Sequence, residues 1–377
     1  MKVLHISNSY MRSKVHYELC RHIDKLCCEQ IIYVPESEIF DPQTNHIESD
    51  NAVVVYSKVI KKYHHYLYTL KIRDIFKDVE KKVDLKGIDV IHASTFFSDG
   101  AVALKIKKKY GIPFVAAVRG TDVNAFLKYR FFDSTCKQLI AEAEKIFFIT
   151  PTIKERFKNS PATKGFEEEI EQKSIVLPNG IDDFWIEHPN LQQKRSGHAV
   201  LYVGRFMQNK NIEVLVSAIN ELKGIIPDIK MHLIGGGGEL NNQIIALCNA
   251  HQDTVTYHGL LKDKHKMLDI MRGCNVFAMV SFHETFGLVY VEAMSQGLPV
   301  LYTKGQGIDG VFPKEVGERV NPYDKEEIKN ALKNLLLKSE NYRPLTENEL
   351  ACFDWNTIAR KYMDVYSRCK FENNENT

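Results

Sequence analysis

The chain has 377 residues, a length that favours two domains over one. Hydrophobic residues make up 44% of it and charged residues 26%, which is typical of a globular protein whose core is large enough to fold without disulfides or metal ions. The formal net charge of +2 is too balanced to indicate nucleic-acid binding.

Cysteine spacing and apolar runs predict the compartment. The eight cysteines form no Cys-x-x-Cys pair and no zinc-like spacing with histidine, so we expect free thiols in a reducing compartment. The apolar stretch within residues 1–11 is too short for a signal peptide, and no run of about 18 apolar residues follows. We therefore expect a cytoplasmic protein that spans no membrane.

Short β-branched runs alternate with helix-like stretches along the chain. The runs predicted as strands are 3–6, 31–34, 53–56, 90–93, 114–118, 146–150, 175–177, 200–203, 231–234, 276–280 and 299–302. Helical periodicity separates most of them, as at 101–109, 212–222, 240–250 and 266–271. This alternation indicates βαβ units and an α/β fold with parallel sheets. A single open sheet rarely has more than about ten strands, and the chain is predicted to have more, so we predict two sheets in two domains.

A domain boundary is predicted near residues 182–198, which are polar, contain Pro189 and show no clean period. The preceding Pro178-Asn179-Gly180 is a strong turn signal, because glycine tolerates positive φ. In doubly wound folds, ligands bind at the carboxyl ends of parallel strands. We therefore expect the functional residues in the loops that follow strands.

The first such loop places Gly204 and Arg205 directly after the strand at 200–203, with Lys210 before the helix at 212–222. An arginine fork and a lysine point charge together suit a diphosphate. A solvated strand-to-helix loop explains the same residues, so this motif alone is weak.

The second loop is a glycine run, Ile-Gly-Gly-Gly-Gly-Glu at 234–239, which includes Gly235. Glycine lets the backbone approach a ligand closely, and a helix that starts just beyond favours anions. No acidic residue follows at the distance that a dinucleotide-binding fold requires. A mobile turn is an equally good interpretation.

The third loop carries the strongest signal. Glu284 follows the strand at 276–280, and Gly287 permits a tight turn into a helix predicted at 288–295. Free amides at that helix start favour an anion, and Glu292 lies one to two turns further on. The two carboxylates are expected to accept hydrogen bonds from hydroxyls of one ligand. The alternative makes Glu284 a partner of the helix dipole and Glu292 a solvated surface residue.

The motifs in this order resemble the family 4 glycosyltransferases, which are retaining enzymes with the two-domain GT-B fold. The resemblance rests on Gly204-Arg205 with Lys210, Glu284-Thr285-Phe286-Gly287, Glu292-Ala293-Met294 and Gly297-Leu298-Pro299, supported by residues 178–182 and 120–122. It spans nearly the whole chain, and residues 286–310 are similar to enzymes of bacterial capsule and surface-polysaccharide clusters.

The resemblance implies two Rossmann-like domains that face a cleft. Residues 1–187 would bind the acceptor, residues 198–354 would bind the nucleotide sugar, and a helix at about 355–377 would pack back on the first domain. A hexose-type sugar would pass from a UDP- or GDP-sugar, which is a substrate rather than a cofactor, to a saccharide or polyprenyl-linked saccharide.

The implied donor-binding residues are Gly204, Arg205, Lys210, Gly235, Glu284, Thr285, Phe286, Gly287, Leu288 and Glu292. Among them, Arg205 and Lys210 would neutralise the leaving diphosphate and Glu284 would contact the sugar, so these three are predicted to be catalytic. Glu292 would contact the ribose. The chain has no Asp-x-Asp triplet for a metal-bound diphosphate, so we expect the two cations to replace a metal.

Acceptor binding is predicted for Ser9, Arg119 and Asp122. Asp122 belongs to the matching Gly-Thr-Asp triplet, whereas the sequence departs from the family at Arg119 and in the first loop. Arg119 stands before the Gly-Thr-Asp triplet, where many relatives carry a histidine, and arginine cannot act as a base near neutral pH. In a front-face retaining mechanism the leaving phosphate itself takes the acceptor proton. The first loop, 7–13, lacks the glycine pair that relatives often have, so either the backbone approaches the diphosphate differently there or the polar side chains substitute for it.

A basic, aromatic-rich segment at 58–82 and the Lys-rich 105–109 offer a peripheral contact with an anionic inner membrane face. Residues 126–132, Phe-Leu-Lys-Tyr-Arg-Phe-Phe, extend that surface or pack a helix. A solvated helix with a core-facing stripe is the alternative.

Two other functions compete with transfer. Another GT-B enzyme, such as a nucleotide-sugar epimerase or a phosphorylase, would need a different acid–base set or a cofactor lysine. An inactive sugar-binding scaffold would not need Arg205, Lys210, Glu284 and Glu292 together.

Overall fold

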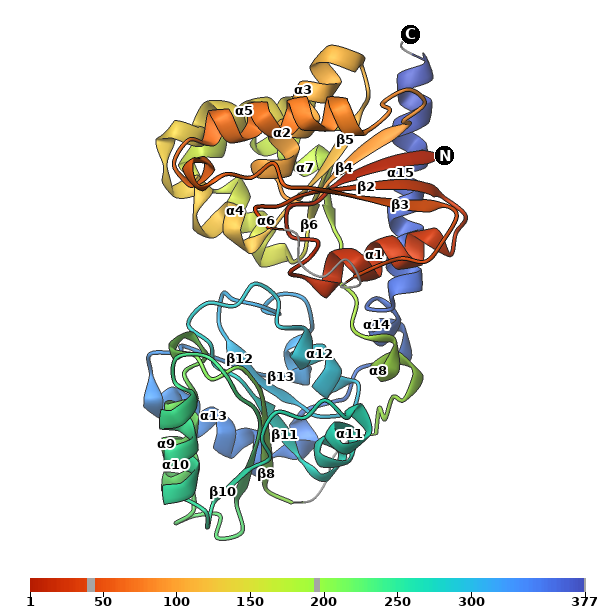
Figure 1. The fold of residues 1–377 in the computed structure, drawn as a ribbon. Helices are drawn as coiled ribbons and strands as arrows, with labels where there is room; N and C mark the ends of the chain where they lie inside the picture. The colour runs from red at the N-terminus through yellow and green to blue at the C-terminus, as the bar shows by residue number, and fades with distance from the viewer. Residues whose placement is uncertain (39–44, 193–196, 376–377) are drawn as a thin grey trace. The chain divides into compact units, whose positions relative to one another are not determined.

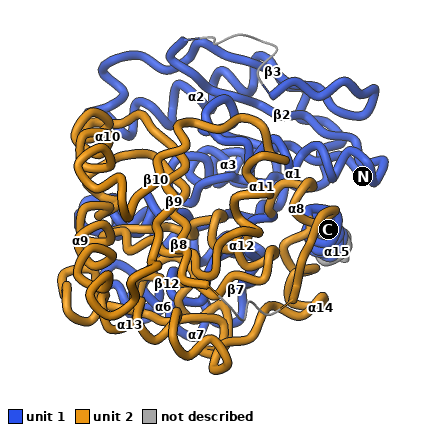
Figure 2. Tube along the Cα trace, turned by 90° about the horizontal axis from the view of Figure 1, so that it is seen from below, with its two compact units in different colours: residues 1–180, 355–377 blue, residues 181–354 orange. Residues whose placement is uncertain are grey.

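The computed structural model describes residues 1–38, 45–192 and 197–375. It divides into two compact units, one formed by Met1–Gly180 with Trp355–Thr377 and the other by Ile181–Asp354 (Figure 2). The predicted α/β class with two parallel sheets is confirmed. Among the described residues, no helix combines the length and the apolar character that crossing a bilayer would need.

Unit 1 is built on a seven-stranded parallel sheet in the order β3-β2-β1-β4-β5-β6-β7 (Figure 1). The strands are β1 Lys2–Ile6, β2 Glu29–Pro35, β3 Ala52–Ser57, β4 Val90–Ala93, β5 Phe114–Val118, β6 Lys145–Phe148 and β7 Ser174–Val176. In register, Leu4 of β1 lies beside Ile31 of β2 and Ile91 of β4. The strand order reverses at β1 and β4, which makes the loops after these two strands the expected ligand position.

The connections of unit 1 are mostly helical. They are α1 Lys14–Asp24, α2 Tyr68–Lys82, α3 Ser98–Tyr110, α4 Gly120–Asn124, α5 Asp133–Glu142, α6 Pro151–Lys158 and α7 Glu167–Lys173, with short 3₁₀ turns η1 Lys62–His65, η2 Phe126–Lys128, η3 Arg130–Phe132 and η4 Pro161–Thr163. Figure 1 shows α2, α3 and α5 on one face of the sheet and α1 on the other.

Unit 2 is built on a six-stranded parallel sheet in the order β10-β9-β8-β11-β12-β13. The strands are β8 Ala199–Gly204, β9 Lys230–Gly235, β10 Val255–Tyr257, β11 Val276–Ala278, β12 Val300–Thr303 and β13 Gly317–Val320. The helices are α8 Asp183–Glu187, α9 Ile212–Leu222, α10 Asn241–Ala250, α11 Lys264–Gly273, α12 Leu288–Met294, α13 Lys325–Leu337 and α14 Glu347–Ala351, with 3₁₀ turns η5 Gln208–Lys210, η6 Lys314–Val316 and η7 Ser339–Asn341.

Two strands, β10 and β13, escaped prediction from the sequence. Each has three or four residues and lies at one edge of its sheet, and each carries exposed polar residues, such as Thr256 and Arg319. An edge strand has only one neighbour and tolerates polar side chains, so it lacks the apolar run that marks a central strand.

Residues 181–187, which we assigned to the first domain, lie in unit 2. The amide of Ile181 donates to the carbonyl of Phe353 at 3.0 Å, and Lys264 Nζ pairs with Asp182 Oδ2 at 2.6 Å. Trp185 of α8 is buried. These contacts fix the start of unit 2 directly after Gly180.

The last helix, α15 (Trp355–Glu375), belongs to unit 1 and packs on α1 and β4. Its Trp355 ring lies against Gly180, where a Cβ atom would come within 2.6 Å of the indole. Glycine is therefore required at the end of the Pro178-Asn179-Gly180 turn for steric reasons. The side chains of Tyr362 and Tyr366 join the buried core under this sheet.

Buried histidines form part of that core. The rings of His5 and His92 lie 5.3 Å apart, and the Tyr366 hydroxyl hydrogen-bonds Nδ1 of His92 at 2.6 Å. The Nε2 atoms of both histidines are buried without a hydrogen-bond partner among the described residues. Burial lowers the pKa of His5 to about 4 and that of His16 to about 3, so these imidazoles are neutral in the fold.

We predict that His5 makes unit 1 sensitive to acid. The unfolded imidazole binds a proton below about pH 6.5, whereas the folded one does not until about pH 4, so its contribution to stability is lost as the pH falls between these values. Replacing His5 with Gln should remove roughly 3 kcal/mol of this pH dependence. Denaturant unfolding at about pH 7 and pH 4.5 measures it, with exposed His46→Gln as control. An equal loss of stability in the native chain and the His5 variant would contradict the prediction.

Candidate functional site

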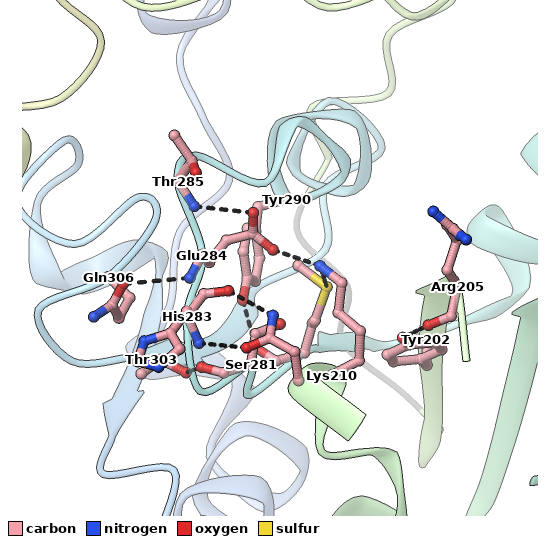
Figure 3. A network of polar contacts seen from close by, with 12 residues as sticks. Tyr202, Arg205, Lys210, Ser281, His283, Glu284, Thr285, Tyr290, Thr303 and Gln306 are labelled. Atoms are coloured by element: carbon pink, nitrogen blue, oxygen red, sulfur yellow. Dashed lines mark hydrogen bonds and ion pairs between the residues drawn. The ribbon is translucent and has the colours of Figure 1, made fainter. Parts of the chain in front are cut away.

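An ion pair between Lys210 and Glu284 lies at the carboxyl-end loops of unit 2. Lys210 ends η5 after β8, and Glu284 lies in the loop after β11. Lys210 Nζ is 2.6 Å from Glu284 Oε2, and the two side chains are only 20% and 15% exposed (Figure 3). The sequence predicted both residues for the site, and the structure brings them into direct contact although 74 positions separate them.

Glu284 is held from two further directions. Its Oε1 accepts a hydrogen bond from the amide of Thr285 at 3.1 Å, and its own amide donates to Gln306 Oε1 at 3.3 Å. The amide of Gly307 donates to the carbonyl of Glu284 at 2.9 Å. The loop after β12 therefore fixes the backbone that carries the carboxylate, which limits the reorganisation needed when a ligand binds.

Asn209 fixes the same loop from the β8 side. Its side-chain amide donates to the carbonyl of His283 at 2.7 Å, and its Oδ1 accepts from the amide of His283 at 2.9 Å. The amide of Phe282 also donates to the Asn209 carbonyl at 2.9 Å. Our sequence reasoning missed Asn209, because a side chain that binds backbone groups leaves no pattern in charge or periodicity.

Gly287 caps α12 with φ of 76°, a left-handed conformation that favours glycine. A Cβ atom there would also lie 2.7 Å from the Tyr290 ring. In the described part of the chain, the amides of Phe286 and Gly287 donate no hydrogen bond. The predicted oxygen-binding amides at 286–288, with Thr285 before them, thus adjoin Glu284, and Leu288 begins the helix.

Arg205 does not join this cluster. It is exposed, and Figure 3 shows its guanidinium pointing away from Lys210 and Glu284. Among the described residues it forms no ion pair within 4.0 Å, although it lies near enough to Glu239 for its charge to lower the pKa of that carboxyl beyond the effect of backbone hydrogen bonds. The long side chain can rotate toward a ligand without breaking a contact.

The glycine run is a packed element rather than a mobile turn. Gly235 has φ of 142°, and a Cβ atom there would lie 1.8 Å from the carbonyl oxygen of Gly204. At Gly238, with φ of 85°, a Cβ atom would lie 2.5 Å from the carbonyl oxygen of Phe206. The ends of β8 and β9 therefore approach so closely that side chains are excluded, and Gly204 and Gly235 shape the loop that carries Arg205.

Glu292 interacts with other charged residues than Glu284 does. It is half-buried near the end of α12, and burial raises its pKa to about 7, with Asp182 raising it further and Lys264 lowering it. Glu292 thus lies within electrostatic reach of Asp182, which repels its charge, and of Lys264 in α11, which attracts it. Its predicted contact with a ribose stays a prediction.

The predicted acceptor residues separate into two groups. Ser9 and Asp122 line a pocket of about 340 Å³ in unit 1, whereas Arg119 does not. Asp122 is buried and accepts hydrogen bonds from the amides of Arg119, Phe96 and Phe97 at 2.8 to 3.3 Å. Its carboxylate is therefore occupied by the backbone, which leaves Ser9 as the predicted residue with an available polar group.

The side chain of Arg119 connects separate segments of unit 1 by hydrogen bonds. Its Nε donates to the carbonyl of Ser94 at 3.1 Å and its Nη1 to Oδ1 of Asn179 at 3.1 Å. These bonds connect the ends of β4 and β5 with the turn that leaves unit 1. Across the described ranges, no three histidine, cysteine or acidic side chains gather closely enough to hold a metal ion.

The comparison with protein families decides the identity of the fold. Residues 13–183 match the family described as Glycosyltransferase Family 4, and residues 183–350 match Glycosyl transferases group 1. The chain is a GT-B glycosyltransferase of the family 4 type. The predicted family, fold and transferase activity are thereby confirmed, and Lys210 and Glu284 lie within the group 1 match.

Relatives and solved structures agree. An uncharacterized glycosyltransferase of Methanocaldococcus jannaschii is 25% identical over 334 residues, which are 85% of this chain and 86% of that protein. A phosphatidyl-myo-inositol mannosyltransferase of Mycobacterium leprae is 28% identical over 53% of this chain and 54% of its own length. Sucrose-phosphate synthase from Thermosynechococcus elongatus superposes with a TM-score of 0.73 over 98% of both chains at 19% identity. Anabaena HepE, solved in complex with UDP, gives 0.67 over 98% of this glycosyltransferase and 100% of its own chain, also at 19% identity.

We predict graded effects of alanine at three glycines of unit 2. Gly235→Ala should destabilise unit 2 by roughly 3 kcal/mol or more, because the new methyl group overlaps a backbone oxygen. Gly237→Ala has space around it but φ of 68°, so it should cost only about 1–2 kcal/mol. Gly273→Ala meets neither obstacle and should be close to neutral. Denaturant unfolding of the three variants tests the order, and equal stabilities would contradict close packing at the β8–β9 end.

Proposed function

We propose that this glycosyltransferase moves a hexose-type sugar from a UDP- or GDP-sugar to a saccharide or lipid-linked saccharide, with retention of anomeric configuration, in surface-polysaccharide synthesis. The observation that carries the proposal is the Lys210–Glu284 pair, fixed by loops after three neighbouring strands of unit 2. The UDP complex of HepE and the phosphatidylinositol acceptor in the name of the mycobacterial relative support the donor and acceptor classes.

The pair suits the charge that develops during transfer. When the bond between the anomeric carbon and the diphosphate oxygen breaks, the diphosphate gains negative charge. Lys210 has three N–H donors, so it can keep its bond to Glu284 and still donate to a phosphate oxygen. Rotation of Arg205 would add a second cation. We propose that these two side chains stabilise the leaving group without a metal.

Glu284 performs a second task in this proposal. Its carboxylate neutralises Lys210 in the absence of donor, and its oxygens offer acceptors for sugar hydroxyls when a donor binds. The amides of Phe286 and Gly287, which donate no hydrogen bond to any described residue, would donate to phosphate or sugar oxygens beside it. For retention, the leaving phosphate oxygen takes the proton of the attacking acceptor hydroxyl, so a protein base at position 119 is not needed.

Peripheral membrane contact is the second part of the proposal. Tyr66 and Leu67 are 89% and 47% exposed, and Tyr129 and Phe131 are 63% and 69% exposed. The two segments meet through the Tyr68 ring, which packs edge-on against Phe132 at 4.9 Å. Lysines at 58–62 precede the first exposed pair, and Lys128 and Arg130 flank Tyr129 in the second segment. Aromatic side chains flanked by cations suit an anionic bilayer surface.

We predict that Lys210→Met lowers transfer roughly 100-fold, because the leaving diphosphate loses a preorganised cation. Lys223→Met removes an exposed lysine of the same unit, which pairs with Asp253, and should leave transfer unchanged.

Thermal unfolding with UDP, GDP, ADP and CDP, each with and without EDTA, identifies the base. A nucleotide at 100 times its Kd stabilises by about 2.7 kcal/mol.

A stabilising nucleotide that acts despite EDTA, and fails with Arg205→Ala, would support a metal-free donor site. Stabilisation that EDTA abolishes would refute metal independence. No response to any nucleotide would instead favour an inactive scaffold.

We predict that the native chain sediments with phosphatidylglycerol vesicles and not with phosphatidylcholine vesicles, and that salt weakens the binding. The double variant Tyr66→Ser/Phe131→Ser should bind roughly thirtyfold more weakly, since two aromatic groups no longer enter the interface. Tyr323→Ser, at a 72% exposed tyrosine of unit 2, is the matched control. Equal binding of both variants would refute this surface.

A further inference from the structure

The pocket of unit 1 lies at the reversal of strand order in its sheet. Asn8 and Ser9 follow β1, Glu36 follows β2 and Thr95 follows β4, so the carboxyl ends of three neighbouring strands line it. Its volume of about 340 Å³ is at the lower end of ligand-binding cavities in proteins. Position and size together mark it as a binding site for a small group.

Glu36 is the unusual residue of this pocket. It is only 4% exposed, and its Oε1 has no hydrogen-bond partner among the described residues, while Oε2 lies 3.4 Å from Nη2 of Arg12. Burial raises the pKa of its carboxyl, whereas the Arg12 charge and a backbone hydrogen bond from Ser37 lower it, so the deficit is confined to Oε1. A buried carboxylate oxygen without a donor is costly, so a ligand that donates a hydrogen bond would relieve the deficit. The terminal torsion of glutamate is soft enough to turn Oε1 toward the pocket.

Lys71 of α2 is a cation in the same pocket, and its ammonium group donates hydrogen bonds. Its Nζ lies 3.4 Å from the Ser98 hydroxyl, which leaves most of its hydrogen-bonding capacity unused. Burial lowers its pKa, and Asp99 and Glu36 raise it. The pocket therefore combines an acceptor that lacks a donor with a donor that lacks strong acceptors.

A sugar hydroxyl fits that combination, because it donates one hydrogen bond and accepts two. Neighbouring hydroxyls on one ring can meet Glu36 and Lys71 at once. Pro35, Ile60 and Phe126 also line the pocket, and they offer apolar surface to the C–H groups of the ring.

A phosphate fits less well. It would bring negative charge toward Glu36 and toward Asp122, which also lines the pocket, and Asp99 already acts on the charge of Lys71. Arg12 already faces Glu36, so little positive charge remains uncompensated.

We infer that Glu36 and Lys71 form an acceptor subsite that selects an uncharged polyhydroxylated ring over a phosphorylated group. This inference rests on the proposed transferase function and names two specificity-determining residues for its acceptor. The diphosphate and lipid portions of a lipid-linked acceptor would then lie outside this pocket.

The test is saturation-transfer NMR on the full chain with methyl α-glucoside, methyl α-mannoside, methyl α-galactoside, glucose 6-phosphate and inorganic phosphate. We expect at least one methyl glycoside to bind, and Glu36→Gln and Lys71→Gln each to weaken it roughly tenfold or more. The surface variants Glu171→Gln and Lys158→Gln, from an exposed ion pair of unit 1, should bind as the native chain does. Thermal unfolding shows whether each variant is folded.

Three outcomes would overturn the inference. In the first, no methyl glycoside binds. In the second, the pocket variants and the surface variants bind the glycoside equally well. In the third, phosphate binds, Glu36→Gln strengthens its binding and Lys71→Gln abolishes it. The last outcome would identify an anion site instead. Nucleotide binding, measured on the same samples, distinguishes a failure of this inference from a failure of the donor proposal. Lys210→Met should lose the response to nucleotide and keep glycoside binding. Glu36→Gln should lose glycoside binding and keep the response to nucleotide.

Discussion

The constraint on which the structure depends is the parallel arrangement of every strand pair in both sheets. Parallel strands send all their carboxyl ends to one edge, so residues far apart in sequence meet in the loops that follow. Lys210 and Glu284 meet this way in unit 2, as do Ser9 and Glu36 in unit 1. The chemistry of each unit is therefore confined to one edge of its sheet by topology alone.

Close backbone approach then fixes the loops of unit 2. Gly235 and Gly238 let the end of β9 and the loop after it contact the backbone at the end of β8 and beyond. Asn209 then connects the loop after β8 to His283. The ion pair sits on this rigid base. A largely desolvated pair contributes little net stability by itself, because the loss of hydration offsets the attraction of its charges. In the function we propose, the pair instead keeps a cation oriented and neutralised until an anionic ligand arrives.

Much of this arrangement was predictable, for identifiable reasons. Central strands bury both faces and so carry long apolar runs, and the glycine and charge motifs after β8 and β11 keep fixed spacings. The edge strands β10 and β13 lacked such runs. Residues of the unit 1 pocket were harder still, since Glu36 and Lys71 are 35 positions apart and belong to no local pattern. Only the fold shows that one oxygen of the Glu36 carboxylate is buried without a donor among the residues that the structure describes.

Arg119 shows how a departure from the family pattern acquires a physical explanation. At this position a histidine would offer a base, whereas Arg119 binds the Ser94 carbonyl and the Asn179 side chain. It also lies close to Tyr362 of α15, whose pKa burial raises and the guanidinium lowers. One cation thus connects the end of β4, the turn where the chain leaves unit 1 and the helix with which it returns. Because a guanidinium carries five donors in a fixed plane, it can hold several such acceptors at once, which a single imidazole cannot. The exchange therefore replaces a titratable group with a structural one, which the mechanism we propose permits because its proton acceptor is the leaving phosphate.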